Sequence, residues 1–168
     1  MKSNLLMNFT VDKENSTVYI KREFDAPLAN VWSAWTEAEI LDQWWAPAPF
    51  TSKTKSMEFT EGGRRLYAMV GTDGEERWSC FDYTSISPKK NFKHSSTFCD
   101  AEGNPNSAFG SSYWDLTFSE QGDLTVVDIA IKRDSFEELE QIVAMGFKEG
   151  ITATMQTLDK IFEEEKQK

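Results

Sequence analysis

Three charged residues stand in otherwise apolar alternating segments, the arrangement that buried ligand recognition or proton transfer would require. Arg22, Asp82 and Asp128 are each preceded, two and four residues earlier, by apolar side chains. Side chains two residues apart on a strand share a face, so all three charges are predicted to face the interior. An ionised group among apolar neighbours must be paired, or its pKa shifts. These residues are candidates for ligand binding or acid–base chemistry, and the alternative is a rim position or a structural pair such as Arg22 with a carboxylate.

Other signatures of catalysis or cofactor binding are missing from the sequence. None of the patterns G-x-S-x-G, P-loop, G-x-G-x-x-G or H-E-x-x-H occurs. The single histidine, His94, excludes paired histidine ligands and most zinc sites, and it is interpreted as an ordinary strand residue. Cys80 and Cys99 lie in neighbouring predicted strands and are expected to stay reduced. We therefore expect no metal and no cofactor, and catalysis is less favoured than binding.

Length, charge and composition limit the class of protein. A chain of 168 residues is predicted to form one domain, 1–168, and its six Trp and twelve Phe residues suit a large core or a cavity lining. The net charge of −10 argues against nucleic acid and anionic membranes as partners. No apolar run approaches the roughly 18 residues of a membrane span, and residues 1–16 lack a signal peptide. We expect a cytoplasmic monomer or weak dimer.

Residues 18–47 predict a strand followed by two short helices, because their hydrophobic period changes from two to helical spacing. Asp25 is expected to cap the first helix, and Thr36 with Glu39 forms a capping box that opens the second. Neither helix is long enough to be stable alone, so both must pack against a sheet. Adjacent tryptophans on a helix cannot both face one core, so one of Trp44–Trp45 is expected at the surface or a cavity mouth.

The middle of the chain is predicted to be a train of antiparallel strands. Its turn signals are Gly62-Gly63, Asp73-Gly74, Ser87-Pro88, Asn104-Pro105-Asn106 and Gln121-Gly122-Asp123. Its alternating runs include Leu66, Ala68 and Val70, then Trp78 and Cys80, then Trp114, Leu116 and Phe118. Asp73-Gly74 predicts a two-residue type I′ turn. The strand at 17–24 is expected to close the sheet beside the last strand, and residues 1–16 to add an extra strand at 9–12.

The C-terminal segment, 135–165, is predicted to be one long helix. Ser135 and Glu138 form a capping box, and an apolar stripe continues from there toward the end of the chain. Gly146 and Gly150 lie beside the stripe, where they would permit a close approach or a bend. Helices at both ends of a strand train indicate an α+β fold.

Several of these motifs together resemble the activator-of-heat-shock-protein-90-ATPase homologues, a family of the START-like superfamily that includes polyketide cyclases. The resemblance rests on D-A-P, V-W-x-A-W-T and E-x-x-x-x-W-W-x-P in residues 25–47, with the glycine pairs and turns downstream, and it covers 18–165. It implies a helix-grip fold, in which a curved antiparallel sheet, two short helices and one long C-terminal helix enclose a cavity.

The resemblance implies three classes of function. The leading hypothesis is a non-catalytic domain that binds a small hydrophobic or amphipathic molecule, such as a lipid, between the sheet and the C-terminal helix. A chaperone-regulating module is the second. The third is a polyketide cyclase-like enzyme that uses Arg22, Asp82 or Asp128 with Tyr67 or Tyr83.

The candidate cavity residues combine inward charges, aromatic rings and adaptable methionines. They are Arg22, Trp45, Met69, Trp78, Asp82, Trp114, Asp128, Met145, Phe147, Gly150, Ile151 and Met155.

Overall fold

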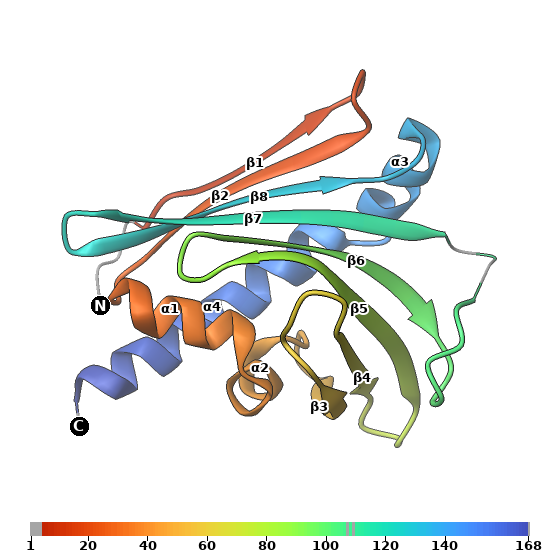
Figure 1. Ribbon diagram of the computed structural model, residues 1–168, viewed down its shortest axis with the longest axis horizontal. Coiled ribbons are helices and arrows are strands. Elements are labelled where there is room, and N and C mark those ends of the chain that lie inside the picture. Colours follow the sequence, from red (N-terminus) through yellow and green to blue (C-terminus); the bar gives the residue numbers. More distant parts are fainter. Residues whose placement is uncertain (1–4, 107, 109, 168) are drawn as a thin grey trace.

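The computed structural model describes residues 5–106, 108 and 110–167 and shows one curved, eight-stranded antiparallel sheet (Figure 1). The strands are β1 (Met7–Asp12), β2 (Thr17–Phe24), β3 (Thr51–Met57), β4 (Arg64–Val70), β5 (Glu76–Ser87), β6 (Asn91–Cys99), β7 (Ser111–Gln121) and β8 (Leu124–Lys132). Their order across the sheet is β1-β2-β8-β7-β6-β5-β4-β3. With its helices, this arrangement confirms the predicted α+β helix-grip fold.

The sheet curves around three helices, α1 (Leu28–Thr36), α2 (Ala38–Trp44) and α4 (Phe147–Lys166), which lie on its concave side (Figure 1). A fourth helix, α3 (Phe136–Ala144), precedes α4. None of the helices in the described part of the chain is long and apolar enough to cross a membrane.

The strand pairing around β2 confirms how the sheet was expected to close. Ile20 of β2 pairs with Ile129 of β8 on one side and with Phe9 of β1 on the other. The extra N-terminal strand expected within 1–16 is therefore β1, and residues 1–4 of that range lie outside the described residues.

Two predicted helix caps are wrong. Helix α1 has Pro27 at its N-cap with no side-chain capping bond. Asp25 instead forms an ion pair with Lys166, whose Nζ lies 2.6 Å from Asp25 Oδ2. Thr36 is the last residue of α1, and its hydroxyl donates to the Trp32 carbonyl at 2.8 Å. The Thr36 hydroxyl therefore bonds within α1 and does not cap α2. The N-cap of α2 is Glu37, which also makes no side-chain capping bond.

Trp44 and Trp45 are both buried, contrary to the expectation that one would be exposed. Trp44 packs on α1, and its Nε1 donates to the Ala34 carbonyl at 2.9 Å. Trp45 follows the end of α2, and its Nε1 donates to the Tyr67 hydroxyl of β4 at 2.9 Å. Helix α2 thus buries the one face that carries Leu41 and Trp44, and Trp45, at its C-cap, is buried separately against β4.

The C-terminal helix is broken where the sequence predicts continuity. The capping box at its start is confirmed, because the Ser135 side chain accepts from the Glu138 amide at 3.2 Å. Gly146 then has a φ of +95°, in the left-handed region that side-chain-bearing residues rarely adopt, and the chain restarts as α4. The break leaves α4 as the long helix that the sheet grips.

The β4–β5 connection also differs from its prediction. Only Gly74 of the Asp73-Gly74 pair has a positive φ, whereas a type I′ turn needs two. The Gly71 amide donates to the Glu75 carbonyl at 2.8 Å, so the loop is longer than the two-residue turn expected.

Candidate functional site

The concave face of β4 to β7 carries buried polar side chains that point between the sheet and the helices. Arg65 and Tyr67 come from β4, Tyr83 from β5, His94 from β6 and Trp114 from β7. We call these five residues the inner polar row. All are buried, and Arg65 has no exposed surface at all. They share a face because strand side chains alternate and neighbouring strands are in register.

Arg65 is buried with an incomplete set of partners. Its Nη2 donates to Ser52 Oγ at 3.0 Å and lies 3.4 Å from the Asp42 carboxylate, and its Nε donates to Thr54 Oγ1 at 3.2 Å. The guanidinium carbon is 3.9 Å from the centre of the Tyr67 ring. The remaining nitrogen, Nη1, has no hydrogen-bond partner among the described residues. Burial lowers the pKa of Arg65, although nearby Asp42 opposes that shift.

Three more buried donors share this condition. Within the part of the chain that the structure describes, Tyr83 OH, Trp114 Nε1 and Trp35 Nε1 of α1 make no hydrogen bond. Burial raises the pKa of Tyr83, so its hydroxyl stays protonated and can donate. A buried donor left unsatisfied costs about 1–3 kcal/mol. Several such donors on one interior surface are unusual for a core built only for stability.

His94 is the centre of an aromatic stack rather than an ordinary strand residue. Its ring lies 4.2 Å from Phe81 and 5.5 Å from Trp114, nearly parallel to both. Burial, together with the positive charge of Arg65, lowers its pKa to about 3. Nδ1 of the neutral ring lies 3.3 Å from the Ser95 carbonyl oxygen. A hydrogen bond between them requires the tautomer that carries its proton on Nδ1. A histidine of such low pKa is a poor base at neutral pH, which weighs against acid–base catalysis here.

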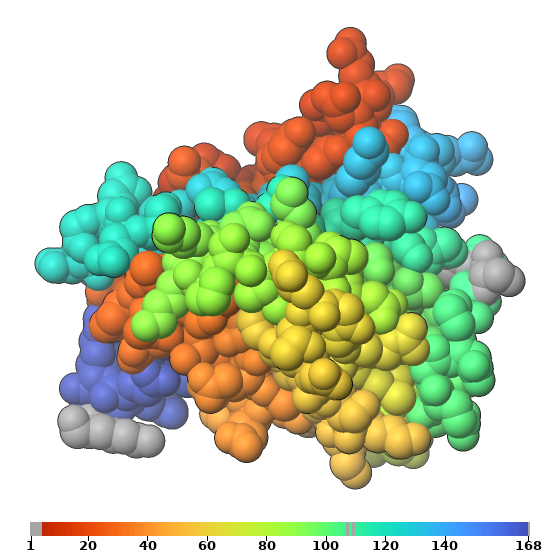
Figure 2. Space-filling model, in the orientation of Figure 1, coloured from red at the N-terminus to blue at the C-terminus, as the bar shows by residue number. Residues whose placement is uncertain are grey.

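Aromatic rings fill the space in which the resemblance implies a cavity. Trp45 contacts Phe81 at 5.5 Å and Trp114 at 5.8 Å between ring centres, and Phe147 of α4 reaches Trp114 at 6.2 Å. On the face shown in Figure 2, the side chains of the described residues pack without a visible opening. A hollow of about 400 Å³ lies on the outer surface, between β1 and β7, bordered by Tyr19 among others.

Arg22 points inward as predicted, and both of its terminal nitrogens have partners. Its Nη1 and Nη2 lie 3.1 Å and 2.5 Å from the two carboxylate oxygens of Asp159 on α4. Nη1 also donates to the Glu23 carbonyl at 2.6 Å. The structural ion pair that the sequence left open is therefore what the structure shows.

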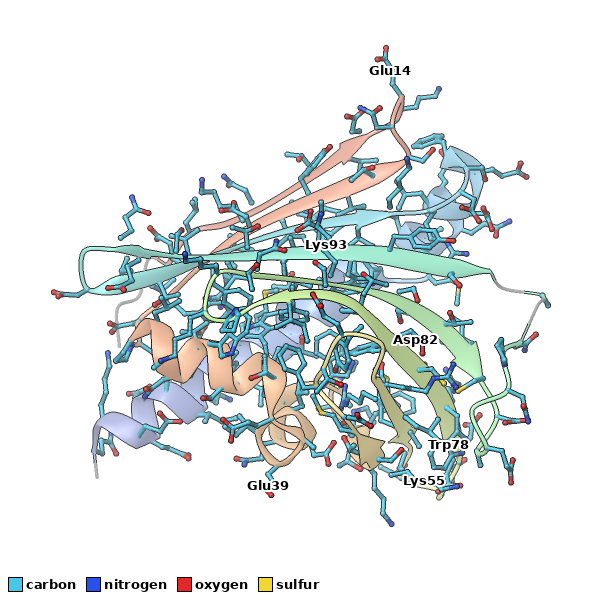
Figure 3. The ribbon with its side chains drawn as sticks, in the orientation of Figure 1. Glu14, Glu39, Lys55, Trp78, Asp82 and Lys93 are labelled. Carbon is cyan, nitrogen blue, oxygen red and sulfur yellow. The ribbon has the colours of Figure 1, made fainter. Side chains whose placement is uncertain are left out.

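Four candidates lie away from the interior. Asp82 and Asp128 are on the outer face, where they pair with Arg64 at 2.7 Å and Lys21 at 3.8 Å. The expectation that these two carboxylates point inward is wrong. Trp78 is on the same outer face, under the ammonium of Lys55 (Figure 3). Met145 sits at the break before α4 and is 80% exposed.

The other candidates divide between the interior and its edge. Trp45, Trp114, Ile151 and Met155 are buried in the interior, and Met69 and Phe147 pack against it while partly exposed. A side chain at Gly150 would meet Pro47 at 4.0 Å, so this glycine faces the segment after α2.

The sequence prediction missed Arg65 and the role of His94. Arg65 alternates with Tyr67 and Met69, a signal of the same kind as the one that marks Arg22. The alternation could have identified Arg65. However, Leu66, Ala68 and Val70 on the opposite face of this strand are more apolar, and that face was assigned to the interior instead.

The two cysteines lie beside each other on the outer face. The sulfur atoms of Cys80 and Cys99 are 2.9 Å apart, and both residues are free thiols. Burial raises the pKa of Cys99 to about 12, which disfavours the reactive thiolate. The proximity that the neighbouring strands suggested is thus present, without a disulfide.

Comparison with known proteins identifies the family. The family described as "Activator of Hsp90 ATPase homolog 1-like protein" matches residues 25–163. A Mycobacterium smegmatis crystal structure has a TM-score of 0.84 and 25% identity, covering 94% of this chain and 97% of that one. An Arthrobacter aurescens solution structure has a TM-score of 0.87 and 26% identity, covering 94% and 91%.

A more distant structure shares the fold alone. The AHSA1 protein of Silicibacter pomeroyi has a TM-score of 0.71 and 15% identity, covering 89% of this chain and 99% of that one. No curated protein matches the chain significantly. Because the family match spans most of the sequence, the chain belongs to the family of activator of Hsp90 ATPase homolog 1-like proteins.

Proposed function

We propose that this protein binds a small hydrophobic or amphipathic molecule between the concave face of the sheet and α4, without catalysing a reaction on it. The observation that carries the proposal is a set of four buried donors that have no hydrogen-bond partner among the described residues: Arg65 Nη1, Tyr83 OH, Trp114 Nε1 and Trp35 Nε1. An interior that served only stability would satisfy these donors or replace them with apolar groups. A bound molecule would supply acceptors to the donors that its polar group reaches.

The aromatic surroundings favour an apolar body for that molecule. Rings of Phe81, His94, Trp114 and Phe147 follow one another from β5 to the start of α4. Binding sites for small molecules are mostly apolar with a few placed polar groups, and this interior has that composition. We propose that the domain acts as one unit, 1–168, in the cytoplasm as a monomer or weak dimer.

Since rings fill the interior, a guest must displace some of them, and Phe147 is the side chain best placed to move. It follows the left-handed Gly146 at the first position of α4, and it is partly exposed. Its ring contacts Phe9 and Trp114, each at 6.2 Å between centres. Helix α3, on the other side of the break, has Leu139 as its one fully buried residue, so it is held loosely. We propose that guests enter beside Phe147.

Thermal unfolding with a neutral apolar compound tests this function. Saturating 1-decanol should raise the melting temperature, because a ligand that binds only the folded state stabilises it by mass action. Replacing Phe147 with Ala should keep or strengthen that shift by easing entry. Absence of any shift in both proteins would mean that the interior is solid core.

Chaperone regulation is the second candidate, and it is supported by the family's description. It predicts that the protein raises the ATP turnover of a 90-kDa heat-shock chaperone. We rank it second, because the buried donors without partners among the described residues point to a small molecule and not to a protein surface. Clear stimulation at micromolar protein, together with no effect of 1-decanol, would reverse the order of the two candidates.

A further inference from the structure

We infer that the molecule bound in the interior carries a carboxylate or a similarly compact anionic group, held by Arg65 Nη1 and Tyr83 OH. This inference rests on the proposed function and adds the chemical class of the ligand. Its starting point is that every unpartnered interior atom named above is an N–H or O–H group. A set of donors calls for acceptors, and an ionised carboxylate is an acceptor without donors of its own.

The charge of Arg65 indicates that the acceptor is anionic. Among the described residues, Asp42 is the carboxylate that pairs with it, at 3.4 Å, and it already accepts hydrogen bonds from the Ser52 hydroxyl and from the amide and hydroxyl of Thr54. Arg22, by contrast, forms a short two-pronged pair with Asp159. A guanidinium with no exposed surface and one long ion pair is stabilised by a second anion.

Sheet register brings the Tyr83 hydroxyl to the same place. Arg65 pairs with Phe81, so Tyr83 is its diagonal neighbour on the concave face of β5. Such neighbours are about 7–8 Å apart, a distance that two long side chains bridge easily. The positive charge of Arg65 also acts on the pKa of Tyr83, as expected for adjacent groups. A carboxylate between them would accept one hydrogen bond from each.

The same register gives the direction and length of the apolar body. Between Arg65 on β4 and Trp114 on β7 lie the rings of Phe81 and His94, on β5 and β6. Neighbouring strands are about 4.8 Å apart, and the path shifts by two residues, about 6.8 Å, between Phe81 and His94, so its two ends are separated by ~16 Å. The ligand class is therefore a monocarboxylic acid with a linear or flat apolar body of that length, whose far end reaches Trp114 and Phe147.

A matched pair of probes separates the acid group from the apolar body. Decanoate and 1-decanol share their chain and differ at the head group, and decanoate is ionised at pH 7. Isothermal titration of the wild-type protein should show decanoate binding about tenfold more tightly than 1-decanol, equivalent to ~1.4 kcal/mol. Arg65→Met should reduce this ratio to about one while 1-decanol binds as before. Tyr83→Phe should lower it by about threefold.

The matched control is Arg64→Met, which removes an adjacent positive charge on the outer face of β4, where Arg64 pairs with Asp82. It should leave the decanoate preference unchanged. Equal affinity for the two probes in the wild-type protein, or a preference that survives Arg65→Met and Tyr83→Phe, would overturn the anion site and leave apolar binding intact. Failure of both probes to bind would overturn the proposed function itself. If Arg65→Met does not fold, Tyr83→Phe alone decides.

Discussion

Two buried arginines at opposite ends of the sheet's concave face have different surroundings. Arg22, on β2, has both terminal nitrogens within 3.1 Å of the Asp159 carboxylate on α4. Arg65, on β4, is more deeply buried but has one ion pair at 3.4 Å and one nitrogen without a partner in the described residues. The first arginine ties a helix to the sheet. The second retains capacity to bind something else.

The strands around each arginine differ in the same way. Apart from Arg22, the concave face of β2 and β8 is apolar except for Thr125, whose hydroxyl donates to the Ala26 carbonyl at 2.8 Å, and Ile20 and Ile129 are paired in register. The concave face of β4 to β6 carries Tyr67, Tyr83 and His94. One half of the interior therefore serves stability, and the other has the composition of a recognition surface. Each prediction below acts on one half and spares the other.

Arg22→Ala should have the largest effect on stability. It leaves Asp159, whose side chain is only 12% exposed, without its partner, and breaking such a largely buried ion pair from one side destabilises by about 3–5 kcal/mol. Urea unfolding measures the change. Lys21→Ala is the control, because its pair with Asp128 is half exposed at 3.8 Å and should contribute less than about 1 kcal/mol. Similar losses in the two variants would contradict a structural role for Arg22.

The pH dependence of stability should report on His94. Its pKa is about 3 in the folded protein against 6.5 in the unfolded chain, so between these values the unfolded state binds one more proton. The contribution of His94 to the free energy of unfolding is therefore fully present above pH 6.5. It falls by about 1.4 kcal/mol per pH unit as the pH drops toward 3. His94→Phe should remove this component while carboxylates contribute equally in both proteins.

Proton NMR gives a direct check of that prediction, because His94 is the only histidine in the chain. Its ring signals should not shift with pH between 8 and 5, which is about two units above the folded-state pKa. A titration midpoint near 6.5 would show that the ring is solvated rather than stacked in the interior.

Two tyrosines in the same half should respond differently to loss of their hydroxyl. Tyr67→Phe removes the acceptor of Trp45 Nε1 and should destabilise by about 1–3 kcal/mol, because a buried N–H loses its partner. Tyr83→Phe removes a hydroxyl with no partner among the described residues, so stability should stay within about 0.5 kcal/mol or rise. Equal losses from both variants would show that Tyr83 already has a structural partner.

Much of the fold follows from periodicity, because the apolar pattern states which segments are strands or helices and in what order. The pattern does not say which face of a strand is concave. The apolar run Leu66 to Val70 was therefore no guide to the interior: the segment around Gly103 covers Leu66 and Cys80 from outside. Because both faces of β4 and β5 are partly buried, their outer face has the apolar pattern of an interior face. The prediction that Asp82 points inward was wrong for the same reason.

Local helix chemistry was less predictable for another reason. The capping sequence at Ser135 acts as expected, whereas Thr36 forms a bond within its own helix. Gly146 indicated that a bend was possible, but a glycine in an apolar stripe does not say that the helix ends there and restarts. The candidate site likewise depends on more than local pattern, since Arg65 and Tyr83 become neighbours through strand register alone.

A crystal structure of the protein with decanoate tests the central claim most directly. We predict that the carboxylate lies between β4 and β5, within about 2.7–3.2 Å of Arg65 Nη1 and Tyr83 OH, with the chain directed toward Trp114. Phe147 should then have moved from its present contact with Trp114. Decanoate bound in the outer hollow between β1 and β7, with the interior rings unchanged, would contradict the account.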